Sequence, residues 1–198
     1  MIKVSVIIPV FNQEELVKRA IDSIPKRDDI EIIAIDDCST DNTFNVLMDY
    51  RDRLDNFTLL TNKENKGVGY TVNRGYDVAS GEYVVLLGSD DYFTGGFNHV
   101  MEMLDGTDLV YFDLEINSGE VWCLTEKSKY GFCGSTKFIR REFLGSTRNP
   151  EVRVGEDWYF YKELMTKNPT ERFSNTVVKH YNFPREDSLS YKQRKGLL

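Results

Sequence analysis

Cysteine is scarce in this sequence, which has three cysteines in 198 residues and no CxxC pair. Cys38, Cys123 and Cys133 therefore predict neither a disulfide framework nor a zinc site, and they suit a reducing compartment. Long hydrophobic runs are also missing, because the opening apolar stretch, residues 4–10, is too short to span a bilayer and no signal-peptide pattern follows it. We expect no transmembrane segment and a cytoplasmic protein, with peripheral contact at the inner membrane face left open.

Clustered basic residues are scarce as well. The formal net charge is −7, and the densest basic stretch is residues 192–195. Binding to nucleic acid is therefore disfavoured, because nucleic-acid-binding proteins carry clustered positive charge. The segment Gly67-Val68-Gly69 follows a loop, and no lysine stands after it in P-loop register, so an NTPase is not indicated. The absence of a GxSxG elbow removes the usual hydrolase signature.

The composition that is present is typical of one folded domain. Hydrophobic residues make up 40% and charged residues 29% of the chain, which are ordinary values for a soluble globular protein. A length of 198 residues suits a single domain, and no repeat, low-complexity segment or linker divides it. We predict one domain over residues 1–183 and a polar tail over residues 184–198.

Strand and helix patterns alternate through the first half of the chain. β-branched and apolar runs predict strands over residues 4–10, 30–35, 57–61 and 83–87. Helical spacing predicts helices over residues 14–24, 43–51 and 67–79. This alternation predicts an α/β fold whose central sheet is mostly parallel and flanked by helices.

The second half of the chain is less regular. Residues 109–116 and 120–125 predict a small antiparallel hairpin, and residues 137–143 predict a strand end leading into a short helix. A half-buried helix is predicted over residues 156–165 and a final strand over residues 175–181.

Two pairs of acidic residues directly follow two of the predicted strands. Asp36 and Asp37 follow the second strand, and Asp90 and Asp91 follow the fourth. Both pairs should open onto the same edge of the sheet, because each directly follows a strand that is predicted to be parallel. In such sheets ligands bind beyond the carboxyl ends of the strands. Asp90 and Asp91 repel each other unless a cation lies nearby, which indicates a hard divalent ion that could bridge to a diphosphate.

The other acidic pair suits a nucleotide. Asp36 and Asp37 could accept hydrogen bonds from a nucleobase N–H or a ribose hydroxyl. The competing interpretation is a turn that caps the next helix, a role that fits Thr40 or Asp41 better.

A third acidic group begins the helix predicted over residues 156–165. Glu156 and Asp157 are stabilised there by the helix dipole, which is a purely structural explanation. The functional interpretation is a general base that takes a proton from an attacking hydroxyl. Trp158 could stack on a sugar or belong to the core. His180 is a candidate metal ligand, although a lone histidine is more often a hydrogen-bonded structural residue.

The order of these segments resembles the family 2 glycosyltransferases of GT-A fold. The matching segments are the opening strand (residues 4–12), the nucleotide-binding turn (35–43), the following helix (65–75), the strand that leads into the metal-binding DxD motif (81–91) and the later acidic motif that carries the base (155–158). The resemblance spans most of the chain and is strongest over residues 1–95. It is specific for the family and not for a substrate.

The resemblance implies an inverting transferase that moves a sugar from a nucleoside diphosphate donor, usually a UDP-sugar, to an acceptor hydroxyl with Mn²⁺ or Mg²⁺. It implies a place in cell-surface or other polysaccharide or glycoconjugate synthesis. The acceptor would be a glycan, a lipid-linked molecule or another hydroxyl compound, and a homodimer is left open. Residues 1–95 would form the nucleotide-binding half of the domain and residues 96–183 the acceptor-side half.

The resemblance also implies roles for individual residues. Asp157 would be the catalytic base, with Glu156 beside it. Asp90 and Asp91 would bind the metal, and His180 is a third candidate ligand. The residues implied in nucleotide binding are Pro9, Phe11, Asn12, Asp36, Asp37, Gly67, Asn73, Ser89 and Asp90.

The sequence departs from the family pattern at several positions. Gly88 stands where the DxD motif usually has its first carboxylate, and Val72 stands where an arginine is usual, with Arg74 two residues on. Residues 188–190 resemble a common closing motif, which makes Arg185 and His180 candidates for contact with the diphosphate.

Two alternatives to an active transferase follow from these departures and from the first loop. A nucleotide-sugar-binding module with impaired catalysis is the runner-up, motivated by Gly88 and Val72. A nucleotidyltransferase ranks last, because Phe11-Asn12-Gln13 does not form the Gly-rich basic loop that such enzymes need.

Overall fold

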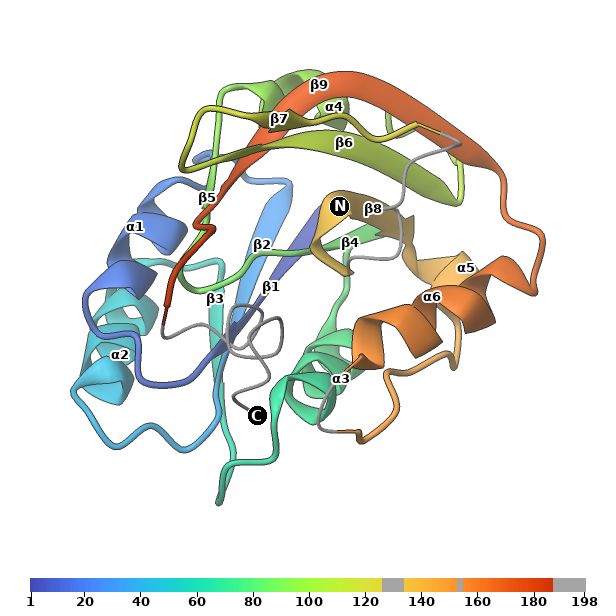
Figure 1. Ribbon diagram of the computed structural model, residues 1–198. Coiled ribbons are helices and arrows are strands. Elements are labelled where there is room, and N and C mark those ends of the chain that lie inside the picture. The colour runs from blue at the N-terminus through green and yellow to red at the C-terminus, as the bar shows by residue number, and fades with distance from the viewer. Residues whose placement is uncertain (126–133, 153–154, 187–198) are drawn as a thin grey trace.

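The structure is a computed structural model that describes residues 1–125, 134–152 and 155–186 (Figure 1). Its strands form one nine-stranded sheet in the order β3-β2-β1-β4-β8-β6-β9-β5, and β7 pairs with β6 beside this path. Cys133, the basic residues 192–195, the closing motif at 188–190 and most of the predicted tail lie outside the described residues.

The bounds of the elements follow the chain. The strands are β1 (Val4–Val10), β2 (Ile30–Asp36), β3 (Phe57–Thr61), β4 (Tyr83–Leu86), β5 (Tyr92–Phe93), β6 (Leu109–Ile116), β7 (Val121–Trp122), β8 (Lys137–Arg140) and β9 (Glu171–Tyr181). The helices are α1 (Leu16–Asp22), α2 (Thr43–Arg53), α3 (Val68–Val78), α4 (Gly96–Met101), α5 (Arg141–Leu144) and α6 (Glu156–Met165), with a 3-10 turn η1 (Gly134–Thr136).

The first four strands make the parallel half of the sheet. β1 pairs in parallel with β2 and with β4, and β2 pairs in parallel with β3. Val10 is opposite Asp36 and Ile7 is opposite Leu86, so the carboxyl ends of β1, β2 and β4 meet at one edge. The acidic pairs that follow β2 and β4 therefore do share an edge of the sheet, as the sequence predicts.

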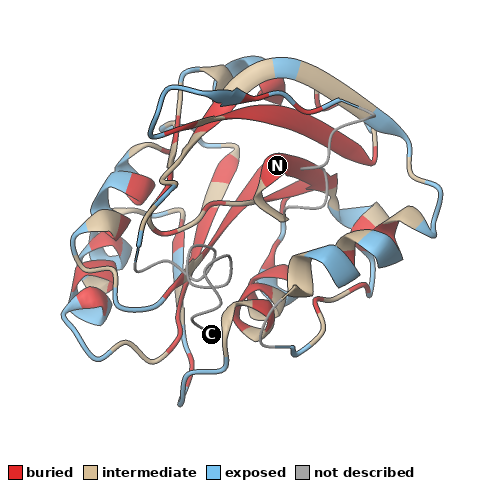
Figure 2. Ribbon diagram, in the orientation of Figure 1, coloured by how far each residue is buried: buried red, intermediate tan, exposed pale blue. Residues whose placement is uncertain are grey.

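Both faces of the parallel strands are buried, which explains their near-continuous apolar sequences. Val6 and Ile8 belong to the core under α1, α2 and α4, whereas Ile7 belongs to the core under α3, α5 and α6. This alternation follows from the two-residue period of a strand. The helices lie on the two sides of the strands in Figure 1, and Figure 2 shows the strands between them as buried.

The other half of the sheet is mixed in direction. β8 lies between β4 and β6 and runs antiparallel to both, while β9 runs parallel to β6 and antiparallel to β5. The predicted hairpin is present, because β6 and β7 pair with Leu114 opposite Trp122. The result is the α/β sheet with a small antiparallel hairpin that the sequence predicts, with more antiparallel pairing beyond β4.

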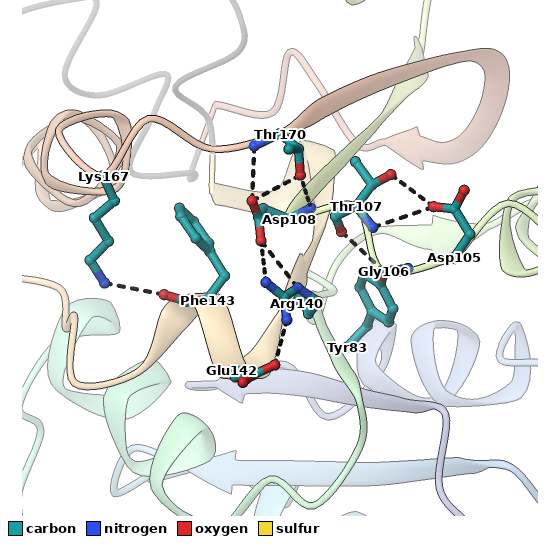
Figure 3. Close-up of polar contacts among 10 residues, drawn as sticks. All are labelled: Tyr83, Asp105, Gly106, Thr107, Asp108, Arg140, Glu142, Phe143, Lys167 and Thr170. Atoms are coloured by element: carbon teal, nitrogen blue, oxygen red, sulfur yellow. Dashed lines mark hydrogen bonds and ion pairs between the residues drawn. The ribbon is translucent and has the colours of Figure 1, made fainter.

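A polar cluster holds the starts of β6 and β9 to the end of β8 (Figure 3). Asp108 Oδ1 accepts a hydrogen bond from Arg140 Nη2 at 2.6 Å, and Asp108 Oδ2 accepts one from the Thr170 N–H at 2.8 Å. Tyr83 of β4 joins it from below, since its hydroxyl donates to the Thr107 carbonyl at 3.0 Å. The cluster lies at the edge of the sheet away from the acidic pairs and positions β8, which follows η1 and leads into α5.

Several predicted bounds need correction. The helix predicted over residues 14–24 is limited to Leu16–Asp22, and the final strand begins at Glu171 instead of at residue 175. The N-cap of α2 is Asn42 and not Thr40 or Asp41. Asp41 still contributes, because its carboxylate accepts the Thr43 N–H at 2.9 Å. No helix in the described part of the chain combines the length and apolar character needed to cross a membrane.

Two adjacent glycines give a first test of the packing between α4 and β9. A β-carbon added at Gly96 would overlap the carbonyl oxygen of Val177 in β9, whereas one added at Gly95 would have no atom within 4 Å. We expect Gly96→Ala to lower the free energy of unfolding by about 1–3 kcal/mol, because backbone cannot move aside as a side chain can. Gly95→Ala is the matched control and should change it little. Urea unfolding measures both, and equal stabilities for the two variants would contradict the packing described.

Candidate functional site

The loops that follow β1 and β2 are bound to each other at the acidic edge. Asn12 has a positive φ of 51°, a conformation that asparagine adopts more readily than most residues. Its N–H donates to the Ser39 hydroxyl at 2.9 Å, and its side-chain carbonyl accepts the Thr40 N–H at 2.8 Å. Phe11, beside it, is 42% exposed. The structure thus brings together Phe11, Asn12 and the turn after β2, and leaves an aromatic face open at their junction.

Asp37 is buried and fully engaged in holding the next loop. Its Oδ1 accepts hydrogen bonds from Asn62 Nδ2 at 2.6 Å and from the Lys66 N–H at 2.9 Å. Its Oδ2 accepts the Gly67 N–H at 2.8 Å, and Gly67 has a φ of 83° that favours glycine. Asp37 and Gly67 therefore shape the loop that leads into α3.

Asp36 keeps more acceptor capacity than Asp37. Both of its carboxylate oxygens lie 3.3 Å from the Ser39 nitrogen, while a carboxylate can accept about four hydrogen bonds. Burial raises the pKa of Asp36, and the negative charges of Asp37 and Asp41 add to the rise. Of the two aspartates, Asp36 is the better candidate for a ligand.

Asp91 is buried and its two oxygens are both occupied. Oδ2 accepts a hydrogen bond from Lys179 Nζ at 3.0 Å, and Oδ1 accepts the Asn182 N–H at 2.9 Å. The Lys179 side chain is 0% exposed, so this is a buried ion pair between the loop after β4 and the end of β9. Asp91 therefore fixes the loop, and each of its oxygens already accepts a hydrogen bond from the protein.

Asp90 has a different environment. Its Oδ2 lies 3.4 Å from Arg185 Nη2, and its backbone carbonyl accepts a hydrogen bond from Arg19 Nη2 at 2.7 Å. Burial raises the pKa of Asp90, the charge of Asp91 raises it further, and Arg185 partly offsets both. A cation bound at this carboxylate would therefore be favoured.

Gly88 has a structural explanation. A β-carbon at this position would lie 2.8 Å from Asp91 Oδ2 and 3.1 Å from Asp90 Oδ1. The loop folds so tightly over residue 88 that a side chain would crowd both carboxylates. Ser89, between Gly88 and Asp90, is buried.

The structure does not bring the three predicted metal ligands together. Among the described residues, no three His, Cys, Asp or Glu side chains form a group that could hold a metal ion. His180 instead stacks on Tyr92 with ring centroids 4.7 Å apart, and its Nε2 lies 3.0 Å from Asn117 Oδ1. The reason is the strand period, because Lys179 points to Asp91 and the next residue points to the other face.

The carboxylate oxygens of Asp90 are the type of ligand that a hard divalent ion prefers. Mg²⁺ and similar ions are often held by one or two carboxylates together with substrate phosphates. Asp90 would supply one such carboxylate, and a substrate phosphate would have to complete the coordination.

The helix α6 begins with the third acidic group. Its N-cap is Gly155 in the left-handed conformation, and Asp157 Oδ1 accepts the Trp158 N–H at 2.8 Å. Burial raises the pKa of Asp157, while the Trp158 N–H and the charge of Lys137 lower it in part. Burial also raises the pKa of Glu156, and the charge of Asp157 adds to that rise.

Asp157 and Glu156 face different neighbours. A β-carbon at Gly134 in η1 would lie 3.3 Å from Leu86 Cδ1 and 3.8 Å from Asp157 Cβ. Asp157 is thus next to the end of β4, the strand that leads to Asp90. Glu156 instead lies near α3, because a β-carbon added at Gly69 in that helix would be 3.5 Å from Glu156 Cβ.

Trp158 is not a core residue. Its side chain is 43% exposed, Lys162 Nζ lies 4.3 Å above its ring, and the Tyr159 ring is 5.2 Å away. This exposure excludes the interpretation of Trp158 as a core residue, which the sequence had left open beside stacking on a sugar.

Asn73 and Val72 have structural roles. Asn73 Nδ2 donates to the Asn149 carbonyl at 2.8 Å and its Oδ1 accepts the Asn149 N–H at 2.8 Å, which ties α3 to the segment before α6. Val72 is 3% exposed in the core with Tyr76, so an arginine would not fit there. Arg74 donates to the Thr61 carbonyl at the end of β3 at 2.6 Å.

Four basic residues complete the site, and one of them, Arg185, is predicted from the sequence. Lys179 carried a detectable signal, because it interrupts the apolar strand pattern of residues 177–181. Arg19 and Lys137 carried none, since an arginine in a surface helix and a lysine at a strand start are ordinary features.

Comparison with known proteins relates this arrangement to a family. The family model described as "Glycosyl transferase family 2" matches residues 5–120. Poly(ribitol-phosphate) beta-glucosyltransferase of Bacillus spizizenii is 36% identical over 95 residues, which are 46% of this chain and 15% of that enzyme. A PGL/p-HBAD biosynthesis glycosyltransferase of Mycobacterium tuberculosis is 29% identical over 195 residues, which are 90% of this chain and 76% of the relative.

Solved structures agree with the fold. Staphylococcus aureus TarS in complex with UDP superposes with a TM-score of 0.80 at 25% identity, over 94% of this chain and 62% of that one. The mannosyltransferase PcManGT from Pyrobaculum calidifontis, in complex with GDP-Man and Mn²⁺, gives a TM-score of 0.75 at 20% identity, over 98% and 60% of the two chains. The chain spans less than two thirds of both structures and a much smaller part of the Bacillus enzyme.

Proposed function

The chain belongs to glycosyl transferase family 2 and has the GT-A fold, and from this premise we propose that it transfers a sugar from a UDP-sugar to an acceptor hydroxyl with inversion. One observation carries the proposal. The end of β4 has Asp90 on the loop that follows it and Asp157 beside it across Gly134. A donor-binding carboxylate and a candidate base therefore border the same edge of the sheet.

The donor would bind over the loops after β1, β2 and β4. Phe11 offers an exposed aromatic face for the nucleobase, and Asp36 offers a carboxylate with acceptor capacity left. Arg185 bridges this region, because its Nη1 donates to Gln13 Oε1 at 3.2 Å and its Nη2 lies 3.4 Å from Asp90 Oδ2. The UDP complex of TarS supports UDP as the nucleotide.

Asp90 would hold Mn²⁺ or Mg²⁺ together with oxygens of the donor diphosphate. A bound divalent ion stabilises the negative charge that develops on the leaving diphosphate. The Mn²⁺ in the mannosyltransferase complex supports a divalent ion in this fold. Arg185 beside Asp90 would add a second positive charge near the same phosphates.

Asp157 would be the general base. Its carboxylate would take the proton of the acceptor hydroxyl as that oxygen bonds to the anomeric carbon, while the bond from the anomeric carbon to the diphosphate oxygen breaks. Attack from the side opposite the diphosphate gives inversion. Burial raises the pKa of Asp157 towards the range in which a carboxylate is an effective base.

The acceptor would approach from the side of α6, where Trp158 exposes a ring on which a sugar can stack. Residues 1–95 would then be the donor half and residues 96–183 the acceptor half. The relatives support a glycan or glycoconjugate acceptor, since the Bacillus relative is named a poly(ribitol-phosphate) glucosyltransferase. A cytoplasmic location with peripheral membrane contact, and a homodimer, stay predictions.

A nucleotide-sugar-binding module without turnover is the second candidate. Gly88 favours it, because the loop after β4 has no carboxylate at that position. Calorimetry with UDP and Mn²⁺, followed by transfer and donor-hydrolysis assays, separates the two. Binding without turnover across several UDP-sugars would establish the module, and turnover would exclude it.

Asp90→Asn tests the donor site directly. UDP with Mn²⁺ should raise the melting temperature of the natural protein, because a ligand that binds only the folded state stabilises it by mass action. We expect Asp90→Asn to weaken the affinity for UDP with Mn²⁺ by roughly tenfold or more, since it removes a charged ligand of the metal. Asp55→Asn, an exposed aspartate before β3, is the control and should bind normally. Unchanged affinity in Asp90→Asn would contradict the proposed donor site.

A further inference from the structure

Lys137 is a buried charge that the proposed reaction does not yet use. It is the first residue of β8, immediately after η1, and its side chain is fully buried with a relative exposure of 0%. Lysine is almost never fully buried without a compensating environment, because an ammonium group loses its hydration in the interior. We therefore look for the groups that stabilise the buried ammonium of Lys137.

Two tyrosine rings surround the ammonium group. Lys137 Nζ lies 5.7 Å from the centroid of the Tyr111 ring in β6 and 5.4 Å from that of the Tyr161 ring in α6. Cations within about 6 Å of an aromatic face are stabilised by the ring electrons. The two rings thus offer the ammonium group a favourable environment between the sheet and α6.

This arrangement brings the positive charge under the face of α6 that carries the proposed base. Tyr161 is one helical turn after Asp157, so the two side chains share a face of α6. The 3-10 turn that precedes Lys137 is also close to Asp157, since a β-carbon added at Gly134 would lie 3.8 Å from Asp157 Cβ and the Gly134 backbone lowers the pKa of Asp157 by a hydrogen bond. Lys137 and Asp157 are therefore neighbours across η1.

Among the residues that the structure describes, the other charged groups near Asp157 do not replace Lys137. Glu156 precedes Asp157 in α6 and adds negative charge, and Glu171 in β9 accepts the hydrogen bond of the Tyr111 hydroxyl at 2.7 Å. Lys137 is the basic side chain whose charge lowers the pKa of Asp157 against the effect of burial. A base must be deprotonated to accept a proton, and burial alone would favour its protonated form.

We propose, on the premise of the proposed transfer, that Lys137 is a positioning residue for Asp157, whose buried ammonium charge keeps that carboxylate ionised and ready to accept the acceptor proton. The step itself is unchanged: the proton passes from the acceptor hydroxyl to Asp157, and Lys137 keeps its own protons throughout. Lys137 acts through Asp157 and touches neither sugar nor nucleotide.

The test is the pH dependence of Lys137→Met. Removing the positive charge raises the pKa of Asp157. The acid limb of the pH profile, in which kcat/KM falls as Asp157 becomes protonated, should therefore move to higher pH by roughly one unit. Activity should approach that of the natural protein well above the new limb, and the affinity for UDP should not change. Lys137→Arg keeps the charge and should restore the original limb.

Lys162→Met is the matched control. Lys162 lies on the same helix as Asp157 but is exposed, so water and salt screen its charge and the acid limb should stay in place. A carbon-13 NMR titration of the Asp157 carboxyl in the free protein, assigned with Asp157→Asn, gives a second readout that does not need activity. If Lys137→Met does not fold, Lys137→Gln replaces it in both measurements.

The outcomes separate this inference from the proposed function. The role of Lys137 is overturned if Lys137→Met changes neither the pH at which kcat/KM falls in acid nor the NMR titration of Asp157. A loss of rate that is equal at all pH values also overturns it. Full transfer by Asp157→Asn would instead refute Asp157 as the base. In that case the NMR titration still decides whether Lys137 controls the ionisation of Asp157.

Discussion

Asp157→Asn is expected to lower the rate of sugar transfer by roughly 10²–10⁴-fold while the affinity for UDP stays that of the natural protein. Asparagine has nearly the shape of aspartate and can still accept the Trp158 N–H hydrogen bond, but it cannot take a proton. The loss should therefore fall on kcat. Steady-state transfer assays with a UDP-sugar, together with calorimetry of UDP, measure the two quantities separately.

The neighbouring carboxylate provides the control. Glu156 has a pKa raised by burial, as Asp157 has, but its β-carbon lies against Gly69 in α3 and not beside the end of β4. We expect Glu156→Gln to reduce transfer by less than about tenfold, below the range typical of a general base. A larger loss in Glu156→Gln than in Asp157→Asn would reverse the assignment.

The pH dependence has a definite sign. Burial raises the pKa of Asp157 above that of an ordinary aspartate, and the base is active only when ionised. Transfer should therefore fall as the pH drops through this raised pKa, at a higher pH than for an exposed aspartate. The residual activity of Asp157→Asn should lack this acid limb.

Lys179→Met is expected to lower the free energy of unfolding by about 3–5 kcal/mol, the largest effect on stability among these predictions. Lys179 and Asp91 form an ion pair at 3.0 Å whose side chains are 0% and 3% exposed. Removing the lysine leaves the Asp91 carboxylate buried, with the hydrogen bond from the Asn182 N–H still in place. Urea unfolding measures the change.

A double-mutant cycle shows whether the loss comes from the unpaired charge. Asp91→Asn combined with Lys179→Met removes both charges and should be more stable than Lys179→Met alone. Lys3→Met is the matched control, because Lys3 and Glu82 form an ion pair at 2.7 Å with side chains 28% and 41% exposed, and such pairs contribute about 0–1 kcal/mol. A loss in Lys179→Met no greater than in Lys3→Met would contradict a buried ion pair.

The parallel half of the fold follows closely from the sequence. The bounds of β1 and β3 agree with the prediction, because strands buried on both faces give uninterrupted apolar runs that end in polar turns. β5 was not predicted. β5 consists of Tyr92 and Phe93, and its pairing with His180 and Lys179 creates it, so no local pattern marks it.

The sequence predicts where the candidate site lies, but not which role each of its residues has. The strand ends predicted that Asp36, Asp37, Asp90 and Asp91 would gather at one edge, and they do. Adjacent aspartates look equivalent in a sequence, yet Asp37 and Asp91 are held by buried partners while Asp36 and Asp90 are less engaged. These partners lie far along the chain: 88 residues separate Asp91 from Lys179.

The link from Asp91 to Lys179 has a consequence for the order in which the protein is made. β9 is inserted between β6 and β5 and is among the last described segments to leave the ribosome. A nascent chain that has just completed β4 can pair its parallel strands, but its Asp91 carboxylate has no ammonium partner until β9 arrives. Contacts this distant in sequence form slowly. The donor edge should therefore mature last, so a newly made chain would pair its parallel strands before it acquires affinity for a nucleotide.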